Sequence, residues 1–210
     1  MSEQSDYRAT ALSFLKHSLE QLASALDDRS RRQARFLSLA TIACDTDEDE
    51  LPRPTARTVV MRDWTSAPPV WQFHTDRRAA KVSERSLSHQ LSAVFWDSSS
   101  QLQIRLLGTA SECRDAAVVH KVWNDLGARG QQSFWRHEAP GTGLAHPTAL
   151  TFAKTVEAAA RGDESLVSPH FMLVDVAVSA VDCLSLADDP HHRVQGQWRQ
   201  DGWEARWVAP

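Results

Sequence analysis

The hydrophobic pattern of the first half of the chain predicts one long helix followed by short strands. Leucines recur at alternating spacings of three and four, which places them on one face of a helix over about residues 6–26. These are Leu12, Leu15, Leu19, Leu22 and Leu26. Apolar runs of strand length then follow at residues 36–44, 55–62, 69–75 and 91–96, with good helix formers at 78–85.

The second half alternates between strand and helix patterns. Over residues 101–111, Leu102, Ile104 and Leu106 share one face of a strand that is polar on its other face. Asp115 is expected to cap a helix that stops at Gly127. A loop is expected over residues 127–147, a helix over 148–160, a strand from residue 170, and a C-terminal hairpin around an Asp-Gly turn at 201–202.

Together these elements predict an α+β chain built on a mostly antiparallel sheet. Helices and strands alternate too irregularly for a doubly wound parallel sheet, and no Gly-rich phosphate loop is present. With 210 residues, the chain fits one sizeable domain or two small ones.

Composition narrows the class of protein. A net charge of -4 argues against a nucleic-acid binder. Cys44, Cys113 and Cys183 are widely spaced, which favours reduced thiols in the cytoplasm. The polar N-terminus predicts no signal peptide, and no apolar run is long enough to cross a membrane. The nine histidines show no convincing ligand spacing, so no metal site is expected.

Cationic and hydrogen-bonding side chains interrupt the apolar strands between residues 57 and 108. Charge in a buried strand is costly unless a partner neutralises it, and an anionic ligand is the simplest such partner. Arg57, Thr75 and Lys81 would bind a phosphate if they converged at a strand end. Arg62 stands five positions after Arg57 and is expected on the opposite face, so the two need not share a role.

The order of these residues resembles a known family. Arg-x-Val-Val-Met-Arg at 57–62, Phe-His-Thr-Asp at 73–76, a lysine six residues after the threonine, and Gln-Ile-Arg-Leu-Leu-Gly at 103–108 are similar to the pyridoxamine 5'-phosphate oxidase-like FMN-binding split-barrel family, in its divergent branch. The C-terminal His-Arg-Val-Gln-Gly-Gln-Trp at 192–198 and Asp-Gly-Trp at 201–203 are similar to that family's last hairpin. The resemblance covers about residues 36–111 and 170–210.

For the fold, the resemblance implies a mostly antiparallel six-stranded split β-barrel with peripheral helices. Residues 1–210 would form a single FMN-binding domain, with a leading helix at 1–30 and the C-terminal strands and hairpin at 170–210. The protein would be a cytoplasmic homodimer with FMN at the subunit interface.

For the site, the resemblance implies that Arg57, Thr75 and Lys81 contact the FMN phosphate. The full expected cofactor-binding set is Arg57, Thr58, Val59, Val60, Arg62, His74, Thr75, Lys81, Gln103 and Gln197, with Arg62 and Arg193 as catalytic residues. Several positions depart from the family pattern. His74 replaces a tyrosine, Gln197 an arginine and Gln195 a histidine, and Val122, Leu126 and Gly130 stand where the family grips a substrate phosphate.

The implied activity is hydride transfer between the flavin and an unidentified small-molecule substrate. Two alternatives stay open, a flavin-binding store or sensor without turnover and a haem-binding relative on the same barrel. Absence of the phosphate-gripping residues favours the store or sensor, whereas retention of Arg62 and Arg193 favours an enzyme.

Overall fold

The computed structural model describes residues 2–27, 35–43, 52–83, 90–147, 149–151, 166–187, 189–200 and 202–210. In these ranges nine strands form one sheet, in which every neighbouring pair is antiparallel. The strands are β1 (Phe36–Ala43), β2 (Arg53–Val60), β3 (Asp63–Ser66), β4 (Pro69–Asp76), β5 (Gln90–Asp97), β6 (Leu102–Glu112), β7 (Phe171–Ser185), β8 (His192–Arg199) and β9 (Gly202–Val208). The helices are α1 (Ser2–Asp27), α2 (Ala80–Ser83), α3 (Ala116–Asp125), α4 (Gly127–Gln132) and the 3-10 helix η3 (Ser133–Trp135).

The long strand β7 divides the sheet into two branches. Its first half pairs with β4 and its second half with β8, while β6 runs beside both halves. The register of β6 shifts between Leu107 and Gly108, where a Cβ on the glycine would lie 2.4 Å from the carbonyl oxygen of Ala177. Only glycine allows this close crossing. On the other side of β6 the order continues through β5 and β1 to β2, which contacts β4 and curls this branch towards a barrel.

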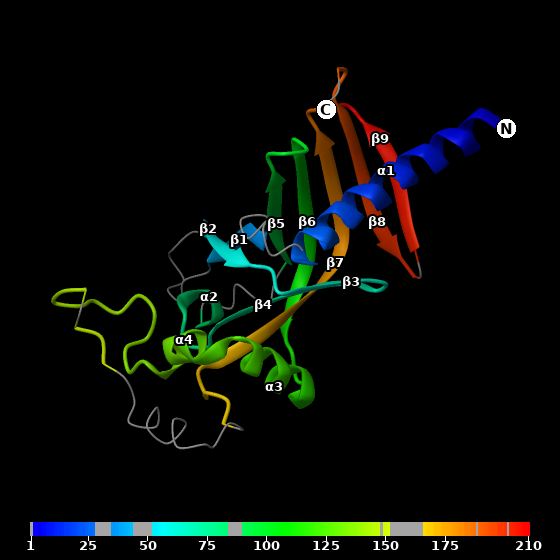
Figure 1. Cartoon of the computed structure of the whole chain (residues 1–210). Helices are drawn as coiled ribbons and strands as arrows, with labels where there is room; N and C mark the ends of the chain where they lie inside the picture. Colours follow the sequence, from blue (N-terminus) through cyan, green and yellow to red (C-terminus); the bar gives the residue numbers. More distant parts are fainter. Residues whose placement is uncertain are drawn as a thin grey trace.

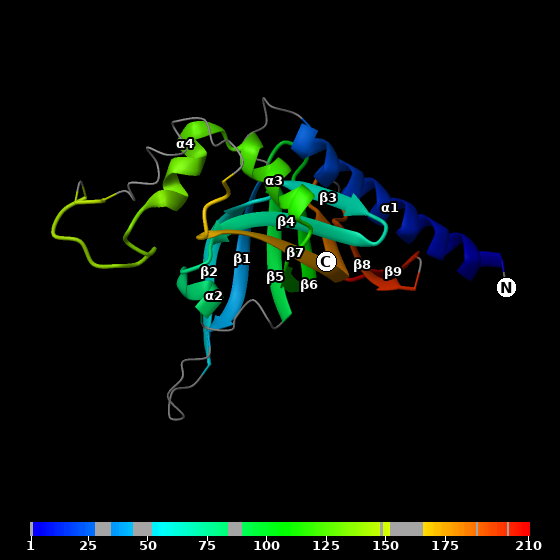
Figure 2. The same cartoon turned by 90° about the horizontal axis from the view of Figure 1, so that it is seen from below.

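Helix α1 covers the second branch. It lies across β8 and β9 in both views (Figures 1 and 2). Its leucine stripe is confirmed, because Leu15 and Leu22 are fully buried in the main core. Gly196 on β8 makes room for the helix, since a Cβ there would lie 2.5 Å from Leu15 Cδ2. None of the described helices combines the length and apolar character needed to span a membrane.

A second, smaller core lies under α3 at the opposite end of the sheet. Asp115 caps α3 as predicted, accepting hydrogen bonds from the backbone N–H groups of Ala117 (2.9 Å) and Val118 (3.3 Å). The loop expected from residue 127 was wrong at its start, because α4 and η3 occupy residues 127–135. Burial of Phe134 and Trp135 in this core explains the difference.

The α+β class and the antiparallel split barrel are confirmed, but the count of six strands was too low. The short β3 is mostly exposed and has no apolar pattern that could predict it. The helix expected over 78–85 is observed as α2, whereas the helix expected over 148–160 falls largely outside the described residues. Cys113 and Cys183 are buried free thiols, and Cys44 is outside the described residues.

Candidate cofactor-binding site

Arg57 is held on the inner side of the barrel by two threonines. It pairs with Leu39 of β1, so its side chain shares the buried face of that hairpin. Its Nη1 donates to Thr41 Oγ1 (2.5 Å) and its Nη2 to Thr55 Oγ1 (2.7 Å). The two hydroxyls are themselves 3.0 Å apart. The guanidinium is therefore oriented by the sheet instead of extending into solvent.

Lys81 on α2 lies close enough to Arg57 for their charges to interact. Burial lowers the pKa of Lys81, and the charge of Arg57 lowers it further, against an opposing effect of Asp76. Thr75 is buried on the inward face of β4, the face that also carries Trp71 and Phe73 into the core. Two like charges held together in a partly buried place favour an anion beside them.

The remaining residues of the predicted β2 segment point in two directions. Val59 is buried in the main core on the same face as Arg57. Thr58 and Val60 alternate with it and lie on the outer face of the sheet. The predicted strand over 55–62 ends earlier than expected, because β2 stops at Val60 and Arg62 lies in the link to β3.

Arg62 and His74 form a separate group beneath the second core. The backbone N–H of Arg62 donates to the carbonyl of Gln72 (2.7 Å), and burial together with the charge of Arg35 lowers the pKa of Arg62. His74 packs against Phe134 and Phe171, each with a ring-centroid distance of 5.6 Å. It lies on the opposite face of β4 from Thr75, so the structure does not bring it to the Arg57–Lys81 pair.

Burial, then the charge of Arg62, lowers the pKa of His74 to about 4 from an ordinary value of 6.5. Between these two pH values the unfolded chain binds more protons than the folded one, so stability rises with pH across this window. We expect His74 to contribute a loss of about 3 kcal/mol in the free energy of unfolding as the pH falls from 7 towards 4.

Urea unfolding of the wild type and of His74→Phe at several pH values measures this loss. The variant should lack that part of the pH dependence, whereas His120→Gln, at an exposed position on α3, should retain it. Parallel pH profiles for wild type and His74→Phe would contradict the prediction.

The outer face of the sheet carries a polar network centred on Asp182 of β7. Its carboxylate accepts hydrogen bonds from Arg105 Nη2 (2.7 Å), Arg193 Nε (3.0 Å) and Nη2 (2.9 Å), and Gln195 Nε2 (3.1 Å). Burial alone would raise the pKa of Asp182, but hydrogen bonds from Arg193 and Gln195 and the charges of both arginines outweigh it, so the pKa lies below its ordinary value. Gln103, on β6, points to this same face.

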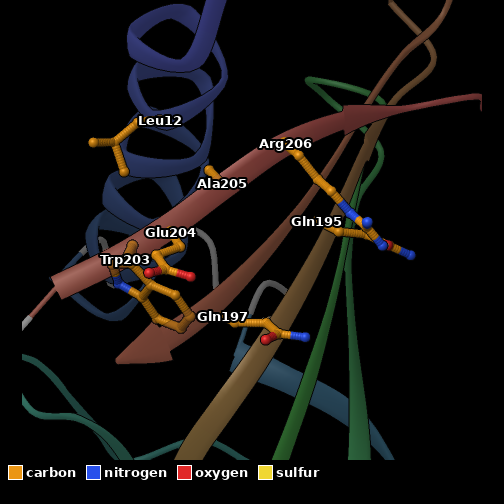
Figure 3. A pocket seen from close by; sticks show the side chains of 7 residues that line it. All are labelled: Leu12, Gln195, Gln197, Trp203, Glu204, Ala205 and Arg206. Carbon is orange, nitrogen blue, oxygen red and sulfur yellow. The ribbon is translucent and has the colours of Figure 1, made fainter. Parts of the chain in front are cut away.

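A pocket of about 580 Å³ opens beside this network at β8 and β9 (Figure 3). Gln197, predicted to reach the flavin, lies in its lining. The other lining residues are Leu12, Gln195, Trp203, Glu204, Ala205 and Arg206. Within the described part of the chain, no group of three His, Cys, Asp or Glu side chains is arranged to hold a metal ion.

The sequence reasoning did not assign roles to Asp182 or Arg206. Asp182 is one of two carboxylates in the otherwise apolar β7, with Asp175, and the cost of burying it predicts a cationic partner. The same argument, that a charge in an apolar strand needs a partner of opposite charge, predicted an anionic partner for Arg57. Arg206 gave no such signal, because a charged residue on an exposed strand face is ordinary.

The architecture is that of a split β-barrel, and two solved structures of similar fold match nearly the whole chain. A pyridoxamine 5'-phosphate oxidase-related, FMN-binding protein from Nostoc punctiforme PCC 73102 has a TM-score of 0.71 and 21% sequence identity, covering 94% of this chain and 96% of that one. PhzG from Burkholderia lata 383, in complex with tetrahydrophenazine-1-carboxylic acid, has a TM-score of 0.66 and 18% identity, covering 93% and 92%.

A sequence comparison supports the same resemblance over part of the chain. Residues 15–113 match the sequence model described as "Pyridoxamine 5'-phosphate oxidase, FMN-binding domain". This match confirms the resemblance of the chain to the pyridoxamine 5'-phosphate oxidase-like FMN-binding family. A search among curated proteins found no match.

Proposed function

We propose that the protein is a cytoplasmic FMN-binding oxidoreductase of pyridoxamine 5'-phosphate oxidase-like type, with residues 1–210 acting as one domain. The observation that carries this proposal is that Arg57, held by Thr41 and Thr55 on the inner side of the barrel, lies close enough to Lys81 for their charges to interact. The family match of residues 15–113, which include all three side chains, supports it.

The phosphate of FMN fits this group of residues chemically. A phosphate would relieve the repulsion between Arg57 and Lys81 that contributes to the lowered pKa of Lys81. The guanidinium of Arg57 offers a donor fork, Lys81 a compact charge and Thr75 a hydroxyl. When bound, FMN would supply hydride transfer, while this chain supplies position and electrostatics.

The outer face of the sheet supports a homodimer. Phe36 on β1, Trp96 on β5 and Leu107 on β6 are 47%, 46% and 42% exposed, unusually high for large apolar side chains. Phe36 and Trp96 are the next residues on this face beyond the cross-strand pair Ser38–Val94, so they belong to one surface. A second copy packed on this surface would remove it from water.

The order of strands explains why two copies would be needed for one complete site. From β2, which carries Arg57, to β8, which carries Arg193 and Gln197, the sheet passes through β1, β5, β6 and β7. At about 4.8 Å per strand this path is roughly 24 Å. A single FMN bound at Arg57 would therefore meet Arg193 and Gln197 from the partner subunit more readily than from its own.

Arg193 and Arg62 are the proposed catalytic residues, and the structure suggests different roles for them. Arg193 is oriented by Asp182 and would place positive charge near the flavin. Arg62, close to the neutral His74, would act at the opposite side of the site.

The substrate in this proposal does not need a phosphate. Val122 and Leu126 pack against the second core, and neither can donate a hydrogen bond from its side chain. They replace the residues with which the family grips pyridoxine phosphate, so turnover of that compound is not part of the proposal.

Absorbance spectroscopy of the purified protein, before and after addition of FMN, tests the cofactor assignment. We expect a bound flavin spectrum and, in gel filtration, the mass of a dimer. Anaerobic reduction by NADH, NADPH or pyridoxine phosphate, followed by reoxidation in air, then tests turnover. A Soret band instead of a flavin band would favour the haem-binding alternative, and a bound flavin that no donor reduces would favour the store or sensor.

A further inference from the structure

Neutral hydroxyl groups, and not a carboxylate, orient the guanidinium of Arg57. Arg78, which follows β4, shows the more usual arrangement, because its Nε (3.0 Å) and Nη2 (2.8 Å) both donate to the carboxylate of Asp76. Arg57 instead donates to Thr41 Oγ1 and Thr55 Oγ1, and within the described part of the chain no carboxylate forms an ion pair with it. Its positive charge is therefore held in place without being neutralised.

The pairing of β1 with β2 brings these two hydroxyls together. Thr41 lies directly opposite Thr55 in the antiparallel ladder. Thr55 and Arg57 are two residues apart on β2, so their side chains lie on the same face of the strand. Thr41 is 3% exposed, whereas Thr55 and Arg57 are only partly buried. The position of the hydroxyl pair is thus set by the register of the sheet.

The hydroxyl hydrogens have acceptors of their own, which leaves the oxygens free to accept from Arg57. Thr55 Oγ1 donates to the carbonyl oxygen of Thr41 (3.3 Å). Thr41 Oγ1 lies 3.0 Å from Thr55 Oγ1 and can donate its hydrogen there. Each hydroxyl oxygen then has a lone pair for one terminal nitrogen of Arg57. Every member of the group is satisfied in this arrangement, so the group can hold a single geometry.

The hydroxyl pair occupies one edge of the guanidinium and leaves another available. Nη1 and Nη2 each use one N–H on a different oxygen, and the oxygens are 3.0 Å apart, so they lie along the end of the fork. The N–H of Nε and the outer N–H groups of the terminal nitrogens are not used by the threonines. Nε and the terminal nitrogen beside it form a side-on edge, whose parallel N–H groups fit two oxygens of a phosphate.

We propose that Thr41 and Thr55 are positioning residues, which hold Arg57 with its side-on edge towards the phosphate of FMN. This inference rests on the phosphate site proposed above and deepens it, because the family resemblance assigned no role to either threonine. A guanidinium that is already oriented binds without the cost of ordering a long side chain. That cost corresponds to about a twofold to twelvefold change in affinity.

Titration of the full-length protein with FMN and with riboflavin, followed by quenching of flavin fluorescence, tests the inference. Valine keeps the shape of threonine but cannot accept a hydrogen bond. Thr41→Val with Thr55→Val should therefore weaken FMN binding by about tenfold and leave riboflavin binding unchanged, because riboflavin has no phosphate. Serine at both positions keeps the hydroxyls and should keep the wild-type affinity for FMN. Thr109→Val, at an exposed position on β6, is the matched control.

A double-mutant cycle determines whether the two threonines act through Arg57. In an Arg57→Met background, the two valines should cause no further loss of FMN affinity, because the guanidinium that the threonines orient is absent. A purely structural role, such as stabilisation of the β1–β2 hairpin, would give the same loss in both backgrounds.

Three results would overturn the inference. They are wild-type FMN affinity in the valine variant, an equal loss of FMN and riboflavin binding, and a loss that persists in the Arg57→Met background. If the double valine variant does not fold, Thr55→Val alone provides the test at a partly exposed position, and wild-type FMN affinity there would also overturn the inference. Any of these results in a protein that binds FMN would leave the proposed function standing. A wild type that binds no FMN would refute both.

Discussion

Replacing both Arg57 and Lys81 with methionine is expected to weaken FMN binding by about a hundredfold to ten-thousandfold. Each cation would lose a charge-assisted hydrogen bond to the phosphate, worth about 1.5–3 kcal/mol. The variant should still fold. Thr41 and Thr55 can keep their hydroxyl contact of 3.0 Å without Arg57, and removal of two cations that repel each other relieves an unfavourable interaction.

Riboflavin provides the sharpest control for this prediction, since it has the same ring system without the phosphate. Titration followed by quenching of flavin fluorescence should show that the double variant loses affinity for FMN and keeps the wild-type affinity for riboflavin. A matched pair, Lys121→Met with Arg129→Met, removes two exposed cations from α3 and α4 and should change neither affinity. An equal loss of FMN and riboflavin binding would place Arg57 and Lys81 away from the phosphate.

Much of the fold could be predicted because its hydrophobic pattern is strictly periodic. The leucine stripe of α1 and the alternation of β6 each bury one face, so spacing alone identifies the element and its inward side. The predicted secondary structure was wrong where tertiary packing, and not the local sequence pattern, determines it. Helix α4 begins at Gly127 and has little apolar character, and the burial of Phe134 and Trp135 of η3 that stabilises this segment involves β7, far away in the sequence.

The candidate site could be predicted only in part, for a related reason. Arg57, Thr75 and Lys81 could be proposed from their order in the sequence and the family resemblance, and Arg57 and Lys81 lie close enough for their charges to interact. The environment of His74 could not be predicted, because Phe134 and Phe171 reach it from distant segments. The polar network centred on Asp182 likewise depends on the cross-strand pairing of β6, β7 and β8. This pairing cannot be predicted from the sequence pattern of any one strand.

Replacing Asp182, at the centre of the polar network on the outer face, gives the second large expected effect. Asp182→Asn should lower the free energy of unfolding by about 2–4 kcal/mol at pH 7. The amide removes the negative charge that faces Arg105 and Arg193, and it presents a donor to groups that are themselves donors. The effect stays below the cost of a fully buried pair, because the side chains of Arg105 and Arg193 are 39% and 25% exposed and can regain water.

The pH dependence separates the loss of charge from a mere packing defect. The pKa of Asp182 is lower in the folded protein than its ordinary value of 3.8, so its stabilisation is complete above that value. The stabilisation is lost as the pH falls through the lower, folded pKa. In urea unfolding, the gap between wild type and Asp182→Asn should therefore close towards pH 2, while Asp125→Asn, exposed at the end of α3, shows no gap at pH 7. If the Asp182→Asn gap persisted unchanged to pH 2, the stabilisation would not come from the ionised carboxylate.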